Sequence, residues 1–405
     1  MNQAKIKVIE LTEYIEKLFQ HDEIPDSVGE ELFDKYKNLV DVEFPSYKTQ
    51  NKWKLKAKGW VGYVPLSNEF VLRLQPKVCI KNLFQMLEYA YDLKSFRILE
   101  GVMDCSSLEE FYNNLAQVLA QRILERCRKG LYRRYLLKTE QLSYIRGRLD
   151  FRQAIQKPWD VKLKCQYEEQ TADIPENQIL AWTLFIIGRS GLCSERVSPI
   201  VRKAYHALQG LITLQQFSPK DCVGRQYNRL NEDYGLLHSF CRFFLENTAP
   251  SYETGDRTTL PFLVNMDRLY ELFVAEWLKA HLPSNFILKF QERVSIGKNL
   301  HFKTDLVLYN CSTPTPCYIL DTKYKTPVSP SSEDIAQVVA YGVSKSCKEV
   351  ILVYPASLTH ALNILVGDIR VRCLTFAVDV NLDDAGQVFL KNLLSLSQAS
   401  YSACN

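Results

Sequence analysis

The sequence lacks the cysteine and histidine spacings that mark zinc proteins. Its 405 residues include twelve cysteines and six histidines, but no CxxC pair occurs and the histidines are scattered. A structural zinc site needs closely spaced Cys and His ligands, so a zinc ribbon or zinc cage is excluded. Scattered cysteines in a chain of this length are typical of reduced, buried thiols.

Long apolar runs are also missing. The longest covers residues 179–187 and is interrupted by Thr183, whereas a membrane-spanning helix needs about 18 apolar residues. Residues 1–19 mix acidic and basic side chains through their apolar positions, unlike a signal peptide. We therefore expect a soluble cytoplasmic protein with no membrane partner.

The sequence contains no loop of the kind that cradles nucleotide phosphates. Neither G-x-x-x-x-G-K-[ST] nor G-x-G-x-x-G occurs, and Gly297-Lys298 is followed by Asn299 without the required upstream glycine. The chain is therefore expected to bind no nucleotide itself. Its 50 basic and 46 acidic residues leave a net charge of +4, which argues against an autonomous, strongly cationic nucleic-acid binder.

The length predicts two or three domains, and the residue pattern changes twice along the chain. Residues 1–78 are expected to form a small, mostly β domain, with a strand at 5–9 but helical spacing at 11–19. Residues 79–260 predict a mainly helical region with one short β-like piece at 145–151. Residues 261–405 predict an α/β domain, so the fold class is α+β and multidomain.

The order of elements in the last region is informative. A helix is expected at 265–281, strands at 286–296, 302–309 and 317–323, a second helix at 332–346, and buried strands at 350–354 and 371–378. This order, α-β-β-β-α-β, indicates helices packed against a central sheet.

Two of these strands carry carboxylates. Asp305 lies in the strand 302–309, and Asp321 closes the next one. Lys323 is two residues beyond Asp321, so on a strand both side chains point to the same face. Two acids and a lysine suit a Mg²⁺ site, because Mg²⁺ prefers carboxylate oxygens, waters and substrate phosphate. The lysine could orient an attacking water and offset charge on the phosphate.

These residues resemble the PD-(D/E)xK nuclease motif. Asp305 and Asp321-Thr322-Lys323 match its acidic and lysine positions, although Thr304 stands where the family often has proline. Gln337 and Tyr341 resemble the QxxxY element of the RecB-like branch, and Glu271 matches a supporting acid on the leading helix. The resemblance implies that Asp305, Asp321 and the Thr322 carbonyl bind Mg²⁺.

A wider resemblance, to McrC proteins, extends over about residues 50–360. It rests on the order of six segments: 59–64 (GWVGYV), 72–77 (LRLQPK), 84–90 (FQMLEYA), 145–151 (IRGRLDF), 176–180 (ENQIL) and 266–274 (MDRLYELFV). McrC is the nuclease subunit of the modification-dependent McrBC restriction system. The resemblance implies Mg²⁺-dependent endonuclease activity on methylated double-stranded DNA, an McrB-like AAA+ GTPase as partner, and docking of that partner on the N-terminal third.

One stretch is strongly basic. Residues 122–152 hold ten Lys and Arg against three acids, a local excess of +7 that exceeds the net charge of the whole chain. Interleaved aromatic residues make this stretch a candidate for contact with a nucleic-acid backbone. A solvated basic surface, or a surface for an acidic protein partner, explains it equally well. The candidate nucleic-acid contacts are Arg126, Arg133, Arg134, Arg146, Arg148 and Arg152.

Two other functions remain open from the sequence. The chain could be a non-catalytic adaptor that stimulates a partner NTPase and grips DNA, or a RecB-like repair nuclease that acts alone. A decayed nuclease would usually have lost one of Asp305, Asp321 and Lys323, so their presence favours catalysis. Cleavage of DNA without any NTPase partner would favour the repair nuclease.

Overall fold

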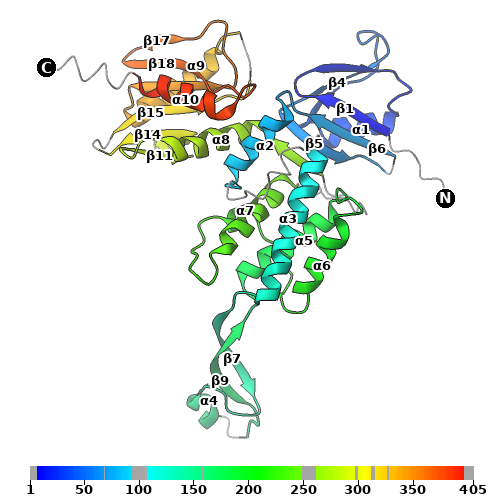
Figure 1. The fold of residues 1–405 in the computed structure, drawn as a ribbon, viewed down its shortest axis with the longest axis vertical. Helices are drawn as coiled ribbons and strands as arrows, with labels where there is room; N and C mark the ends of the chain where they lie inside the picture. The colour runs from blue at the N-terminus through cyan, green and yellow to red at the C-terminus, as the bar shows by residue number, and fades with distance from the viewer. Residues whose placement is uncertain are drawn as a thin grey trace, which may run out of the picture. The chain divides into compact units, whose positions relative to one another are not determined.

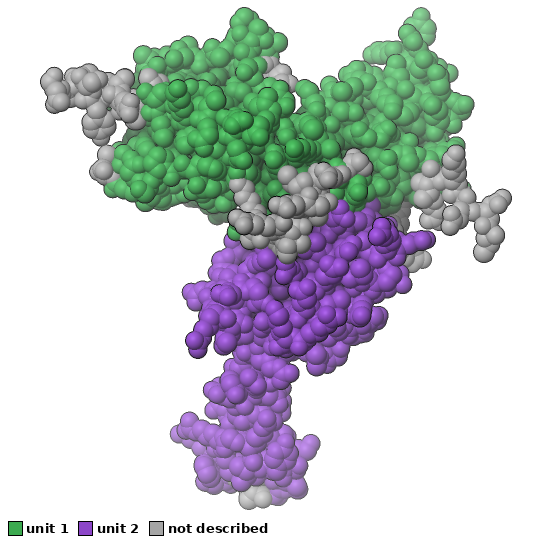
Figure 2. All heavy atoms as spheres, viewed as in Figure 1, with its two compact units in different colours: residues 1–111, 249–255, 261–405 green, residues 112–248, 256–260 purple. Residues whose placement is uncertain are grey.

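A computed structural model describes residues 7–67, 69–93, 105, 107–156, 159–248, 261–296, 300–311, 315–325 and 328–395. The chain divides into two compact units, coloured separately in Figure 2. Unit 1 contains residues 1–111, 249–255 and 261–405, and unit 2 contains residues 112–248 and 256–260. The mixed α+β, multidomain character predicted from the sequence is confirmed.

The N-terminal part of unit 1 is built on a four-stranded sheet in the order β1-β6-β5-β10. Its strands are β1 (Lys7–Thr12), β5 (Trp60–Pro65), β6 (Phe70–Gln75) and β10 (Phe262–Asn265). The helical spacing expected at residues 11–19 is wrong. There β1 ends at Thr12 and β2 (Glu16–Phe19) follows. The end of β1 alternates buried and more exposed residues and pairs in parallel with β6, which is strand and not helix geometry.

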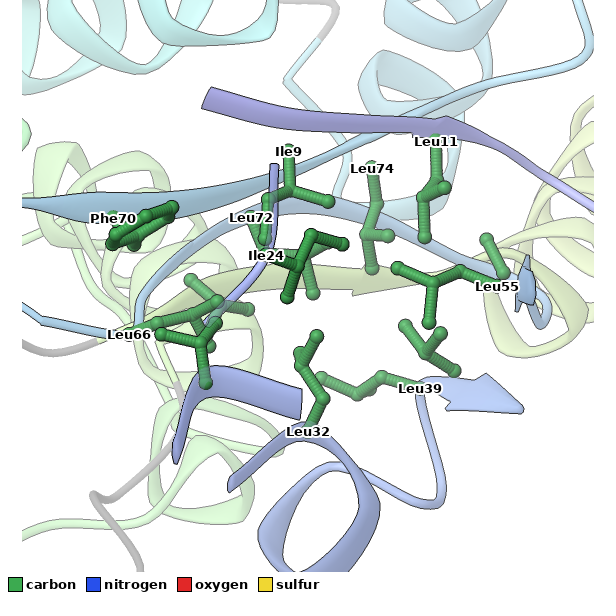
Figure 3. Close-up of a cluster of buried hydrophobic side chains, with 14 of the residues drawn as sticks. Ile9, Leu11, Ile24, Leu32, Leu39, Leu55, Leu66, Phe70, Leu72 and Leu74 are labelled. Carbon is green, nitrogen blue, oxygen red and sulfur yellow. The ribbon is translucent and has the colours of Figure 1, made fainter. Parts of the chain in front are cut away.

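A second sheet, ordered β2-β4-β3, packs beside α1. Its remaining elements are β3 (Val40–Glu43), β4 (Trp53–Ala57) and the helix α1 (Asp26–Lys35). Figure 3 shows the apolar cluster that joins the two sheets, with Leu11 and Leu74 from one meeting Leu55 from the other and Leu32 from α1. These side chains are almost completely buried, so this cluster is the core of the N-terminal part.

Strand β10 belongs to this sheet although it comes from much later in the chain. It pairs antiparallel with β5, with Leu263 opposite Gly62. Gly62 has a φ of +147°, and a Cβ there would overlap the carbonyl oxygen of Phe262. Only glycine allows the two backbones to approach this closely. The predicted ranges 1–78 and 261–405 therefore share one sheet.

The rest of unit 1 is a six-stranded sheet ordered β11-β14-β15-β16-β18-β17, with a separate β12-β13 pair (Figure 1). Pairing is antiparallel from β11 to β15, parallel from β15 to β18, and antiparallel again at β17. The strands are β11 (Phe286–Phe290), β12 (Arg293–Ile296), β13 (Leu300–Lys303), β14 (Leu306–Asn310), β15 (Pro316–Thr322), β16 (Glu349–Tyr354), β17 (Asn363–Val366) and β18 (Ile369–Thr375).

The helices of this part are α2 (Ile80–Ala90), α8 (Met266–His281), α9 (Ser332–Lys345) and α10 (Leu382–Leu394). The sequence predicts α8 and α9 nearly to the residue. The chain order is α8-β11-β12-β13-β14-β15-α9-β16, so it matches the predicted α-β-β-β-α-β order only when the separate β12-β13 pair is left aside. Two predicted strands are each divided in the structure. Residues 286–296 form β11 and β12, and residues 302–309 are interrupted at Thr304 and Asp305.

Unit 2 combines helices with a projecting β structure. The helices are α3 (Leu108–Lys129), α5 (Pro175–Arg189), α6 (Ser198–Leu208), α7 (Asp233–Asn247) and the short 3₁₀ helix Pro219–Cys222. The projection consists of β7 (Arg134–Leu142), β8 (Arg148–Leu149), β9 (Leu163–Thr171) and the helix α4 (Phe151–Gln156), which lies at its far end (Figure 1). The prediction of a mainly helical region missed β7 and β9, because most of their side chains are polar or exposed.

Within the described ranges, no helix combines the length and apolar character needed to cross a lipid bilayer. Every cysteine that the structure places is free, as expected, but the expectation that the thiols are buried is wrong for Cys79 and Cys311, which are exposed.

Substitution of Gly62 by alanine should destabilise unit 1 by about 2–4 kcal/mol, because the new methyl group meets the Phe262 carbonyl. Gly367→Ala is the matched control. Gly367 also has a positive φ of +61°, but nothing lies within 4 Å of its Cβ position, so only a backbone cost of about 1 kcal/mol is expected. Thermal unfolding of both variants measures the difference, and equal losses would contradict the close approach of β5 and β10.

The buried His238 should make the stability of unit 2 depend on pH. Its Nδ1 accepts a hydrogen bond from the Tyr227 hydroxyl (2.8 Å), and its Nε2–H donates to the Glu176 carbonyl (3.0 Å). Burial lowers the pKa of His238 from 6.5 to about 4. Between pH 6.5 and 4, His238 is therefore protonated in the unfolded chain and neutral in the folded chain. Stability should fall by on the order of 3 kcal/mol as the pH drops from 6.5 to 4.

Chemical denaturation across this pH range provides the measurement. His238→Gln should flatten the pH dependence, whereas His206→Gln, at an exposed position on α6, should leave it unchanged. A wild-type stability that rises toward pH 4 would contradict the neutral, buried state of His238.

Candidate active site

The pairing of β14 with β15 brings the two sequence-predicted aspartates to one end of the sheet. Leu306 lies opposite Leu320 in this antiparallel pair. Asp305 therefore comes just before β14, and Asp321 and Thr322 close β15. The Asp305 Oδ2 accepts hydrogen bonds from the Thr322 backbone N–H (2.8 Å) and the Thr322 hydroxyl (3.0 Å), so these bonds fix the first acid against the end of the strand that carries the second.

Asp321 and Lys323 form an ion pair at this end. The Lys323 Nζ lies 2.7 Å from the Asp321 Oδ2, and Asp321 is only 1% exposed. The backbone N–H of Lys323 donates to the Val353 carbonyl on β16 (2.9 Å). The lysine is therefore held both by its backbone and by its charge.

Helix α9 contributes the other partners of Lys323. The Nζ donates to Gln337 Oε1 (3.0 Å), and Gln337 Nε2 donates to the Tyr341 hydroxyl (2.7 Å). Asp334 Oδ1 lies 3.9 Å from the same Nζ. The structure thus brings Gln337 and Tyr341 to the lysine as one hydrogen-bonded chain.

Helix α8 carries Glu271. This carboxylate accepts hydrogen bonds from Gln291 Nε2 (2.8 Å) and Arg268 Nη1 (3.1 Å). Its negative charge raises the pKa of both Asp305 and Asp321, so Glu271 lies close enough to act on the pair.

The site concentrates negative charge in a poorly solvated place. Burial is the largest cause of the raised pKa of Asp305, followed by the charge of Asp321. Burial also raises the pKa of Asp321, against the opposing effect of Lys323. For Lys323, burial disfavours the charged form, but Asp321 and Asp334 outweigh it and raise the pKa. The carboxylates of Asp305, Asp321 and Glu271 therefore repel one another, and a cation bound beside them would relieve this repulsion.

Two acids of the site were missed by the sequence analysis. Asp334 lies one helical turn before Gln337, is largely buried, and pairs with Lys325 (2.6 Å) as well as with Lys323. Asp267 lies one turn before Glu271, and burial raises its pKa while Lys323 and Lys325 lower it. The i, i+3 and i, i+4 spacing to already suspected residues was the signal that could have found both.

The six candidate nucleic-acid contacts are spread over unit 2 and differ in their partners. Arg126 pairs with Asp233 (3.4 Å), Arg146 with Glu169 (3.5 Å), and Arg134 with Glu176. No ion pair is found within the described residues for the other three, Arg133, Arg148 and Arg152.

Arg148 and Arg152 lie on the projection, beside a cavity of about 510 Å³ that Lys164 and Asp150 also line. The same projection exposes large apolar side chains, among them Trp159 at 77% and Val161 at 82%. We call the β7–β9 projection the tip; its exposed apolar members are Tyr135, Leu136, Leu137, Tyr144, Ile145, Phe151, Ile155, Trp159 and Val161. So many exposed apolar residues on a small structure are typical of an interaction surface.

The chain is similar over much of its length to known proteins. The family model of the McrBC 5-methylcytosine restriction system component matches residues 55–355. The type IV methyl-directed restriction enzyme EcoKMcrBC of Escherichia coli K12 is 25% identical over 216 residues, which cover 52% of this chain and 61% of that protein. The match thus spans less than two thirds of the E. coli protein.

One solved assembly has the same fold. It is a refined half-complex from a tetradecameric assembly of Thermococcus gammatolerans McrB AAA+ hexamers with bound McrC. The match has a TM-score of 0.56 and 18% identity, and it covers 95% of this chain and all of the matched one. Since the family model matches well over half of the sequence, the chain belongs to the family of McrBC 5-methylcytosine restriction system components.

Proposed function

We propose that the chain is an McrC-type endonuclease subunit that hydrolyses DNA phosphodiester bonds with Mg²⁺. The observation that carries the proposal is the ion pair of Lys323 with the buried Asp321 (2.7 Å), beside a second carboxylate, Asp305, fixed on Thr322. Two hard anions and one cation at a strand end are the groups that metal-assisted hydrolysis of a phosphodiester needs. The sheet and helices around them support assignment to the PD-(D/E)xK superfamily.

The donor set fits Mg²⁺. No group of three or more His, Cys, Asp and Glu side chains in the described parts of the chain is already arranged around a common point. Mg²⁺ does not require one, since it is usually bound by one or two carboxylates and several waters. Asp305 and Asp321, with the Thr322 carbonyl, would hold it, and the mutual repulsion that raises the pKa of Asp305 would be relieved. Bound there, the ion would activate water and offset charge on the phosphate.

The remaining residues act around the phosphate. Lys323 would orient the attacking water and stabilise the negative charge that develops on the phosphate oxygens. Gln337 holds the lysine and is itself held by Tyr341, so both keep Lys323 in place. Glu271 would add negative charge on the metal side.

A motor partner is part of the proposal. The T. gammatolerans assembly joins McrC to McrB AAA+ hexamers, and we propose the same class of partner here, with methylated double-stranded DNA as substrate. Docking of the motor on the N-terminal third follows from the family resemblance. A non-catalytic adaptor would not need to keep Asp305, Asp321 and Lys323 together, and a stand-alone repair nuclease would not need a motor.

Asp321→Asn and Lys323→Ala should each reduce DNA cleavage at least ~100-fold, because one removes a metal-binding charge and the other the cation beside the phosphate. Cleavage of methylated plasmid DNA is measured with the cognate motor, GTP and Mg²⁺. Asp368→Asn and Lys391→Ala, at exposed positions of the same sheet region, are the matched controls. Full cutting by either site variant would exclude the catalytic assignment, and cutting without the motor would favour the repair nuclease.

The tip has a function of its own in this proposal. Arg148 and Arg152 could follow a DNA backbone, as predicted from the sequence. The exposed apolar residues favour the alternative of a protein partner, since phosphate contacts need charge and not apolar area. We propose that the tip is a second docking surface for the motor partner, in addition to the N-terminal third, and that its arginines contact acidic groups there.

The two functions of the tip predict different results. If the tip binds the motor, Trp159→Ser should weaken the complex at least ~10-fold while DNA binding by the isolated chain stays unchanged. Arg148→Ala/Arg152→Ala should then act on the same complex. Leu211→Ser and Arg202→Ala, at exposed positions on unit 2, serve as controls. If the arginine pair instead lowers DNA affinity and reduces its salt dependence by about two phosphate contacts, the tip binds DNA.

A further inference from the structure

The backbone that carries Lys323 continues into a tyrosine that bonds to the N-terminal part of unit 1. After β15 the chain makes a tight turn, in which the Lys325 N–H donates to the Lys323 carbonyl (2.9 Å). Tyr324 stands at the centre of this turn and is only 7% exposed. Its hydroxyl donates a hydrogen bond to Glu13 Oε2 (3.3 Å).

Glu13 belongs to the N-terminal part of unit 1. Its backbone N–H donates to the Gln75 carbonyl at the end of β6 (3.1 Å), and its Oε2 also accepts the N–H of Lys77 (3.0 Å). One carboxylate oxygen therefore joins the end of the N-terminal sheet to the residue next to Lys323. This hydrogen bond joins residues that are 311 positions apart in the sequence.

Burial of the Glu13 carboxylate costs free energy. Glu13 is 0% exposed, and its other oxygen, Oε1, has no hydrogen-bond partner among the described residues. Burial raises the pKa of Glu13 to about 7, although Lys77 and Tyr324 oppose the shift. An apolar residue would fill a plain core position at lower cost, so packing alone does not explain a glutamate here.

Packing also leaves the Tyr324 ring incompletely enclosed. The ring lies 5.8 Å from that of Tyr270 between centroids, but it also lines a cavity of about 240 Å³ together with Tyr14 and Lys77. Because packing does not fill the space beside the Tyr324 ring, the hydrogen bond to Glu13 fixes the position of the ring.

From these contacts we propose that Glu13 and Tyr324 are positioning residues for Lys323, and that they connect the N-terminal sheet to the candidate active site. This rests on the proposed nuclease function and adds residues to it. The Tyr324–Glu13 bond fixes the turn 323–325 from one side, while Asp321 and Gln337 fix the Lys323 side chain from the other. Neither Glu13 nor Tyr324 touches the reacting groups.

The test uses the full-length chain with its motor partner, GTP and Mg²⁺. Tyr324→Phe keeps the ring and removes only the hydroxyl, and it should lower kcat for DNA cleavage about tenfold, since small displacements of a catalytic group are costly. KM for DNA, GTP hydrolysis by the partner and the unfolding temperature should stay unchanged. Tyr47→Phe, at a fully exposed tyrosine, is the control.

Glu13 variants separate positioning from structure. Glu13→Ala should reproduce the loss in kcat. Glu13→Gln should keep kcat at the wild-type value, because an amide oxygen can accept the hydrogen bonds from the Tyr324 hydroxyl and the Lys77 N–H. The double variant Glu13→Ala/Tyr324→Phe should lose no more than either single one, since both break the same bond. Glu69→Ala, at an exposed position, is the control for the loss of a glutamate.

The outcomes distinguish this inference from the proposed function. If the wild type cuts and Tyr324→Phe cuts equally well, the positioning role is overturned while the nuclease stands. A loss in kcat that follows a lowered unfolding temperature, without rescue by Glu13→Gln, also overturns it. If neither the wild type nor any variant cuts, the proposed function fails and the inference fails with it.

Discussion

The register of β14 against β15 is the constraint on which the candidate site depends. Leu306 faces Leu320 in this pair, which leaves Asp305 and Asp321 at the same end, beyond the apolar interior of the sheet. The charged groups of α8 and α9 are useful only because this end is already fixed. A shift by one residue would turn the Asp321 and Lys323 side chains together to the other face of the sheet, away from Gln337.

The parts of the site that follow local periodicity were predictable. Asp321 and Lys323 lie two apart at a strand end, and Gln337 and Tyr341 lie four apart on a helix, so in each case the spacing states which side chains lie together. Asp305 was predicted inside a strand, but the strand is interrupted there. Thr304 turns inward, its hydroxyl bonds to the Glu292 carbonyl, and Asp305 is left at the break. The Glu292 carbonyl, which bonds to Thr304, cannot be recognised from the local sequence pattern.

The predictions that were wrong or missing also concern residues whose structure depends on partners distant in the sequence. Residues 11–19 have a helical spacing of apolar side chains, but the pairing of β1 with β6 and of β2 with β4 decides their structure. Strands β7 and β9 carry few buried residues, since they pair with each other along their whole length and bury little else. Glu13 could not be recognised at all, because its importance lies in a hydrogen bond to a residue at the other end of the chain.

The position of β10 has a consequence for the order in which the protein is made. Tyr63 of β5 pairs with Phe262 of β10, and all of unit 2 is synthesised between them. Until β10 leaves the ribosome, β5 is an open edge strand able to pair with other chains. Early folding of unit 2 as a compact unit would limit the distance between β5 and β10 and shorten that exposure. The insertion of unit 2 between β5 and β10 in the sequence thus delays completion of the N-terminal sheet during synthesis.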